Sequence, residues 1–139
     1  ESLVNSLESI VSGFSDQIGP FAVDLSRYLS KLFVKMYQKD FNIQQRMITR
    51  LSLVAAAGCL KTLTQIIDAP ISQESIIGME GEVIALCEFI FACDSADYIE
   101  DILVLMNSYL HKTQIISPSL WFYYQVIIYN IVGIPKQLW

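Results

Sequence analysis

Charged residues are scarce in this chain, and basic residues are scarcer than acidic ones. Only 17% of its 139 residues are charged, and 9 Lys and Arg stand against 14 Asp and Glu, a formal net charge of −5. Clustered Lys and Arg bind a phosphate backbone by displacing its counterions, so this balance argues against direct nucleic-acid binding and suits basic protein partners. The one basic row, Arg27, Lys31, Lys35 and Lys39, is typical of the solvated face of a helix.

Cysteine and histidine, the usual ligands of zinc, are also few. Cys59, Cys87 and Cys93 lie in apolar runs without a CxxC pair, which predicts buried free thiols in a reducing compartment rather than disulfides or a zinc site. The single histidine, His111, stands beside Lys112 at a predicted helix end, where such side chains bind the last carbonyl groups. Without a nucleophile–base pair, paired carboxylates or a phosphate loop, we expect no enzyme and no cofactor.

One stretch without charge, Ile115 to Ile134, has to be tested as a membrane span, which needs about 20 apolar residues. Ser117-Pro118-Ser119 stands near one end, and Gln125 and Asn130 lie inside the stretch. What remains, about 14 residues, predicts a buried helix and no contact with a membrane. The chain begins with no cleavable signal sequence, which favours the cytosol or nucleus.

The apolar content is high, at 53% of the residues, so the chain can build a core and is not disordered. It has no initiator methionine, and residues 120–139 are almost entirely apolar. In a stack of repeats each unit covers the face of the next, so a cut between repeats leaves such a face open. We therefore expect residues 1–139 to be a segment of a larger protein.

The spacing of apolar residues is that of α-helices, and Gly and Pro fall mostly between them. Six helices are predicted, over about residues 2–13, 20 to beyond 36, 43–67, 72–92, 95–111 and 117–132. Pairs of helices recur at about 50 residues, slightly above the spacing of HEAT and armadillo repeats. The predicted fold is all-α, an α-solenoid of antiparallel helix pairs, although a single six-helix bundle fits the same pattern.

The apolar positions also predict how these helices pack. The first helix carries Leu3, Leu7, Ile10 and Phe14 on one side, with Val4 and Val11 beside them. The second has a core stripe of Phe21, Leu25, Leu29, Leu32, Phe33 and Met36. In the third, the small residues 55–58 allow a neighbouring helix to approach closely, and in the sixth we expect Trp121 to anchor the core.

Two stretches carry a resemblance to a known family. Residues 7–25 (LESIVSGFSDQIGPFAVDL) look like a linker in which an acidic turn precedes a proline-led helix, and residues 98–121 (YIEDILVLMNSYL…ISPSLW) end in an (Ile/Val)-Ser-Pro-x-(Met/Leu)-Trp pattern. Both resemble later repeats in the importin-seven and importin-eight branch of the importin-β family of nuclear transport receptors. Residues 131–139 depart from the family by their apolar character.

This resemblance implies a receptor of HEAT repeats that shuttles between cytoplasm and nucleus and carries basic cargo proteins. Its parent would bind Ran-GTP through N-terminal repeats outside this chain and would contact Phe-Gly nucleoporins at nuclear pores. The third and fifth predicted helices would line the concave face, where Asp97, Glu100 and Asp101 are the candidate cargo contacts. The alternatives are that these carboxylates only complement a helix dipole, and that the protein is a generic HEAT-repeat scaffold or an exportin relative.

Overall fold

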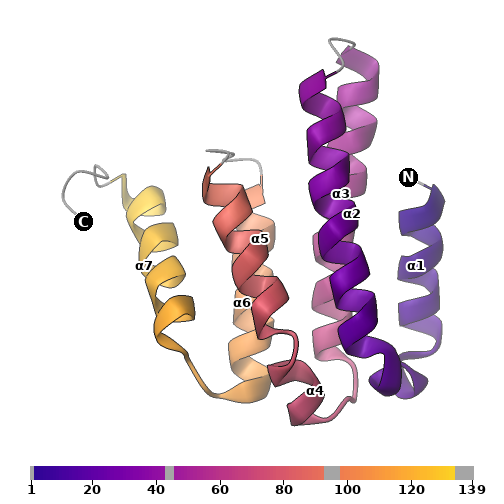
Figure 1. Cartoon of the computed structure of the whole chain (residues 1–139), viewed down its shortest axis with the longest axis vertical. Helices are drawn as coiled ribbons and strands as arrows, with labels where there is room; N and C mark the ends of the chain where they lie inside the picture. The colour runs from indigo at the N-terminus through magenta and orange to yellow at the C-terminus, as the bar shows by residue number, and fades with distance from the viewer. Residues whose placement is uncertain (1, 43–45, 93–97, 134–139) are drawn as a thin grey trace.

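A computed structural model describes residues 2–42, 46–92 and 98–133, with the backbone alone at residues 2, 38–42, 46–53, 130 and 131. The described secondary structure is entirely helical, without a strand, so the expected all-α class is confirmed (Figure 1). The α-helices are α1 (Ser2–Gly13), α2 (Ala22–Asn42), α3 (Arg46–Asp68), α4 (Gln73–Ile77), α5 (Glu80–Ala92), α6 (Ile99–Thr113) and α7 (Pro118–Val132). Two short 3-10 turns, Ser15–Gln17 and Gly19–Phe21, precede α2.

The helices stand side by side in two layers (Figure 1). One layer consists of α1, α3 and α6, with α3 in the middle, and the other of α2, α5 and α7, with the short α4 at the turn before α5. Because each helix of one layer is joined to a helix of the other, the chain forms a HEAT-like array of stacked pairs. α3 contacts α6 more extensively than α2 contacts α5.

The first helix buries only part of its apolar surface. Val4 and Val11 are buried against the core, whereas Leu3, Ile10 and Phe14 are about half exposed. The side on which the sequence gathers Leu3, Ile10 and Phe14 is therefore mostly open, because α1 has its main neighbour, α3, on one flank and stands at the edge of the array. A helix at the edge of a stack can cover only the face that meets its neighbour.

The core stripe predicted for the second helix is correct except at its first member. Phe21 is 62% exposed because it belongs to the 3-10 turn that precedes α2, and the buried face of the helix begins instead at Ala22. Farther along α2, Leu29, Leu32 and Phe33 are buried as expected. Pro20 stands in the same turn. Its lack of an N–H costs nothing there, because the first residues of a helix donate no intrahelical hydrogen bond.

Aromatic rings join α2 to the helices beside it. Phe33 of α2 meets Tyr98, just before α6, edge to face at a ring-centroid distance of 5.1 Å, and Tyr37 meets Phe89 of α5 in the same way at 5.3 Å. Edge-to-face pairs add to the free energy gained by burying the rings, about 1 kcal/mol each. The group holds the two helix pairs in one core.

The fourth predicted helix, residues 72–92, is divided into α4 and α5 in the structure. Ser72 caps α4, its side-chain oxygen accepting a hydrogen bond from the amide of Ser75, and Gly78 ends the helix. Met79 follows and is fully buried, and α5 begins at Glu80. Gly78 and Gly81, residues that lower helix stability, thus flank the point at which the helix restarts.

The corner between α6 and α7 follows the sequence signals. Gln114 ends α6 in the left-handed conformation, with φ of 54°. Ser117, where the sixth predicted helix begins, caps α7 by accepting a hydrogen bond from the amide of Leu120, and Pro118 occupies the first turn.

α7 has apolar side chains on its open side as well as on its buried side. Leu120 and Ile127 are buried, whereas Trp121, Phe122 and Val132 are at least half exposed. The expectation that Trp121 anchors the core is therefore wrong for the described chain, because no described helix packs on that side of α7. Among the described helices, none combines the length and apolar character that crossing a membrane requires.

Candidate functional site

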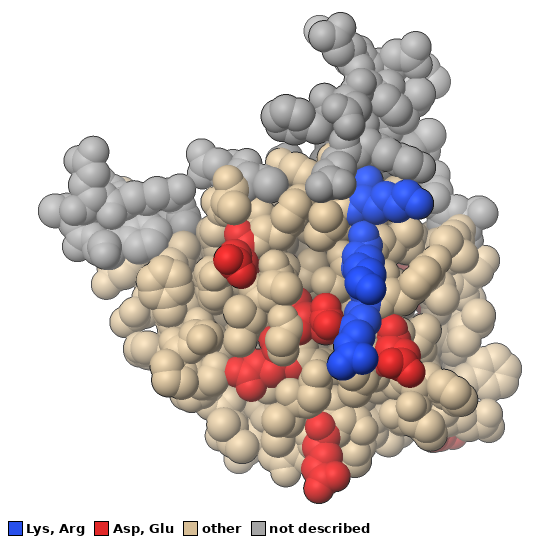
Figure 2. Space-filling view, in the orientation of Figure 1, with Lys and Arg blue, Asp and Glu red and all other residues tan. Residues whose placement is uncertain are grey.

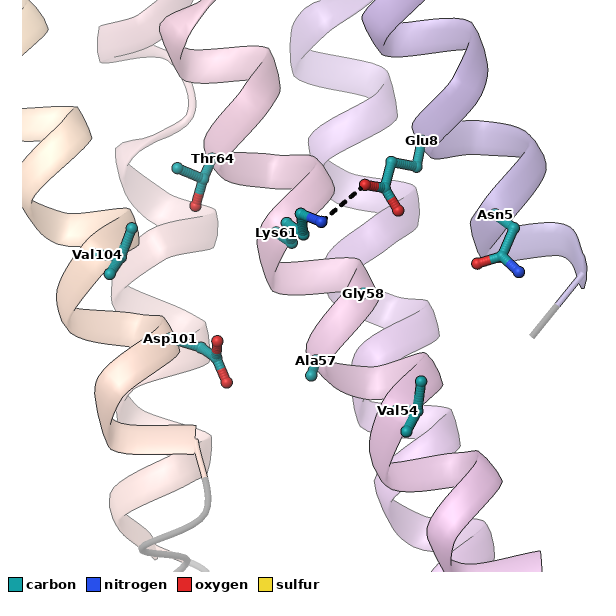
Figure 3. Close-up of a pocket in the computed structure, with 9 residues that line it drawn as sticks. All are labelled: Asn5, Glu8, Val54, Ala57, Gly58, Lys61, Thr64, Asp101 and Val104. Atoms are coloured by element: carbon teal, nitrogen blue, oxygen red, sulfur yellow. Dashed lines mark ion pairs between the residues drawn. The ribbon is translucent and has the colours of Figure 1, made fainter.

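A groove of about 370 Å³ lies on the layer formed by α1, α3 and α6 (Figure 3). α3 forms its floor, and the other two helices supply its walls. The lining residues are Asn5 and Glu8 from α1, Val54, Ala57, Gly58, Lys61 and Thr64 from α3, and Asp101 and Val104 from α6.

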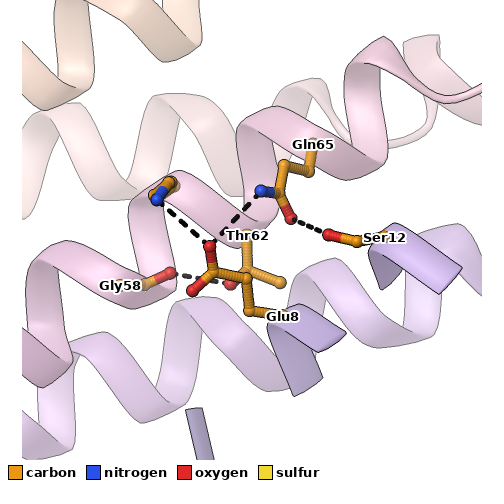
Figure 4. A network of polar contacts seen from close by, with 6 residues as sticks. Glu8, Ser12, Gly58, Thr62 and Gln65 are labelled. Atoms are coloured by element: carbon orange, nitrogen blue, oxygen red, sulfur yellow. Dashed lines mark hydrogen bonds and ion pairs between the residues drawn. The ribbon is translucent and has the colours of Figure 1, made fainter. Parts of the chain in front are cut away.

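The wall formed by α1 is placed by a close helix contact at Gly58. A Cβ atom on residue 58 would lie 2.7 Å from Cγ1 of Val4, closer than side chains in proteins normally come. The absence of a side chain therefore lets α1 approach α3, which confirms the close approach predicted for residues 55–58. The hydroxyl of Thr62 donates to the Gly58 carbonyl at 2.8 Å within α3 (Figure 4).

Glu8 is held over α3 by polar contacts (Figure 4). Its Oε1 atom lies 3.1 Å from Nζ of Lys61 and accepts a second contact from Nε2 of Gln65 at 3.4 Å. Oε1 of Gln65 in turn accepts from the hydroxyl of Ser12 at 3.3 Å. One oxygen of Glu8 makes both of these contacts, which leaves its other carboxylate oxygen for a group entering the groove.

Asp101 stands on the opposite wall, in the first turn of α6, and its side chain points across the groove toward α3 (Figure 3). Burial raises the pKa of Asp101 above its ordinary value, and the adjacent carboxylate of Glu100 raises it further. Both effects disfavour the ionised form, and a positive charge placed in the groove would relieve them.

The three acidic residues proposed from the sequence have different positions. Asp101 lines the groove, Glu100 is exposed beside it, and Asp97 lies outside the described residues. The structure thus brings Asp101 together with Glu8 and Lys61, which sequence reasoning missed. Little in the sequence indicated this pair, because Glu8 and Lys61 are 53 positions apart and each is an isolated charge in its helix.

Apolar side chains complete the groove. Val54 of α3 and Val104 of α6 are 59% and 51% exposed and line the groove beside the charged residues. Carboxylates beside exposed aliphatic groups suit a Lys or Arg side chain, whose charged head pairs with the acid while its methylene stem packs on the valines.

The two described thiols, Cys59 and Cys87, lie buried in the core and do not line the groove. Burial raises the pKa of the Cys59 thiol to about 11 and that of Cys87 to about 12, so both thiols remain protonated at neutral pH. Cys93 lies outside the described residues. Within the part of the chain that the structure covers, no group of His, Cys, Asp and Glu could hold a metal ion.

Comparison with known proteins gives two related sequences. The chain is 25% identical to an importin beta-like SAD2 homolog of Arabidopsis thaliana over 122 residues, and 24% identical to a probable importin-7 homolog of Dictyostelium discoideum over 124 residues; each alignment covers 87% of this chain. It spans only 12% and 11% of those relatives. No family model and no solved structure matches the chain. These similarities support a relationship with importin-β-like proteins.

Proposed function

We propose that residues 1–139 are a HEAT-repeat segment of a larger nuclear transport receptor, of the importin-seven and importin-eight kind, and that the α1–α3–α6 groove binds basic segments of cargo proteins. The similarity to two importin-like sequences over 87% of the chain carries the first part of this proposal. The charge and shape of the groove carry the second. The segment acts as a binding scaffold and not as an enzyme.

The exposed apolar faces at the two edges of the array support a larger parent. Leu3 and Phe14 lie exposed at the α1 edge, and Trp121 and Phe122 at the α7 edge. In a solenoid these faces are covered by the helices of the neighbouring repeats. The alternation of inner and outer helices would then continue in both directions.

The α1–α3–α6 layer is the side that suits cargo. Its helices α3 and α6 contact each other more extensively than α2 and α5 do, which suits the inner side of a curved stack. In the proposed receptor this layer forms the concave face, where a solenoid encloses its partner. The net charge of −5 attracts basic proteins to this face at long range.

The parent receptor would bind Ran-GTP and Phe-Gly nucleoporins through other repeats and would shuttle between cytoplasm and nucleus through the pores. Retention of the full-length parent on immobilised Ran tests this part. Selective retention on Ran loaded with GTP, and not with GDP, is the expected result. Equal retention on both forms, or none, contradicts a transport receptor and leaves a helical scaffold with another partner.

Cargo binding by the groove is tested with a fluorescent Lys- and Arg-rich peptide and the 139-residue chain. Replacing both wall carboxylates, in Glu8→Gln/Asp101→Asn, should weaken binding about tenfold, because two charge-assisted contacts are lost. The matched control is Glu74→Gln/Glu88→Gln, which removes the same charge from two exposed residues outside the groove. Equal losses in the two variants would mean that net charge alone attracts the peptide.

A further inference from the structure

One helix of the layer opposite the groove, α2, carries a row of basic side chains on a chain that is acidic overall. Arg27, Lys31 and Lys35, which we call the basic row, form a single column along α2 (Figure 2). The fourth residue of the predicted row, Lys39, has a side chain outside the described residues. The chain has a net charge of −5, so a column of positive charge on one helix differs in sign from the molecule as a whole.

Among the described residues, two of the three cations of the basic row have no counter-ion. Arg27 lies 3.7 Å from Asp24 and 3.6 Å from Glu82, and its side chain is still 58% exposed. Lys31 and Lys35 are exposed, and neither forms an ion pair within the described part of the chain. Two of the three cations are therefore available to a partner at no cost in broken contacts.

The spacing of the basic row matches one kind of ligand. Residues four apart on an α-helix are about 6 Å apart along its axis. In an extended peptide, alternate side chains point to the same side at intervals of about 6.6 Å. Acidic residues at every second position of an extended segment would thus meet the three cations in order, from Arg27 to Lys35.

The surroundings of the basic row favour a narrow peptide over a nucleic acid. Acidic side chains lie on both sides of the column (Figure 2), including Asp24 and Glu82 beside Arg27. A broad phosphate backbone would meet these carboxylates, whereas one edge of an extended peptide need not. Tyr28, which is about half exposed, lies one turn from Lys31 on the same side of α2 and offers the aromatic contact common in peptide interfaces.

We propose that the basic row on α2 is a second interaction surface, which binds an acidic, extended protein segment on the layer opposite the cargo groove. The surface does not depend on the proposed transport role, because it uses different residues and a partner of opposite charge. The two layers would hold partners of opposite sign at the same time.

The test is fluorescence anisotropy of a short peptide of alternating Glu and Thr, titrated with the 139-residue chain at low salt. We expect saturable binding that weakens as salt is added, and a loss of about tenfold in Lys31→Gln/Lys35→Gln, because two exposed ion pairs disappear. Circular dichroism should show that this variant is folded, since both lysines are exposed.

The control, Ser9→Glu/Ser119→Glu, makes the same change in net charge at exposed positions of α1 and α7. It should bind the acidic peptide nearly as well as the unaltered chain. Absence of saturable binding would overturn the proposal, as would an equal loss in the control. A single-stranded RNA oligonucleotide that binds the basic row more tightly than the peptide would also overturn it.

Discussion

Gly58 is the residue on which the position of α1 depends. Gly58→Ala gains helix propensity, about 1 kcal/mol, but places a methyl group against Val4, a stiff β-branched side chain 2.7 Å away. Overpacking of this kind costs about 1–3 kcal/mol. We expect the free energy of unfolding of Gly58→Ala to fall by about 1 kcal/mol, as measured by chemical denaturation.

The control for this prediction is Gly81→Ala in α5, because no atom lies within 4 Å of the added methyl group there. That variant should lose no stability. The cost of Gly58→Ala should also shrink in the background of Val4→Ala, since the two residues are in contact. If Gly58→Ala is as stable as Gly81→Ala, the contact does not place α1.

Asp101 should reduce stability at neutral pH, which is the pattern of a residue kept for binding. Its pKa is raised by burial and by Glu100, so the folded chain holds this proton more tightly than the unfolded chain does. The contribution of Asp101 to folding stability is therefore most favourable at a pH below its pKa in the unfolded chain. That contribution is lost as the pH rises through its raised pKa in the folded chain.

Asp101→Asn should accordingly raise the midpoint of thermal unfolding at pH 7, and the difference should vanish as the pH falls and Asp101 becomes protonated. Glu74→Gln, at an exposed residue of α4, should show no comparable dependence. A destabilised Asp101→Asn variant at pH 7 would mean that the interaction of this carboxylate with the α6 dipole outweighs its burial.

Among the helices, α7 is the one whose local signals can be tested by a single change. Ser117→Ala removes the side-chain oxygen that accepts the amide of Leu120 and should cost about 1 kcal/mol. The effect should concentrate in α7, as faster amide hydrogen exchange there than in α3. Ser119→Ala, two positions along and exposed, is the control, and equal exchange in both variants would show that the cap contributes little.

Helix identities and caps could be read from the sequence because they depend on neighbours along the chain. Ser117 and Pro118 mark the start of α7 in the sequence as in the structure. The prediction of one helix over residues 72–92 misses the break between α4 and α5 after Gly78. The buried side of α1 could not be read in this way. Leu3 and Val4 both belong to the apolar side of that helix, and which of them is covered depends on Gly58, 54 positions after Val4.

At the scale of the whole molecule, the array brings together charges that the sequence separates. Asp101 was predictable as an acidic residue in a first helical turn, but its partners across the groove, Glu8 and Lys61, come from other helices. Their meeting depends on how three helices stack. The α1–α3–α6 groove, with two carboxylates and Lys61, and the basic row of α2 thus lie on opposite layers.

The most direct test of this account is a nuclear magnetic resonance titration of the isotope-labelled chain with the Lys- and Arg-rich peptide. The account predicts saturable changes at the amides that line the groove, among them Val54, Lys61, Asp101 and Val104, while the amides of α2 and α7 stay unchanged. Changes confined to α2 or α7, or no saturable change at all, would contradict the proposal that the α1–α3–α6 face binds basic cargo.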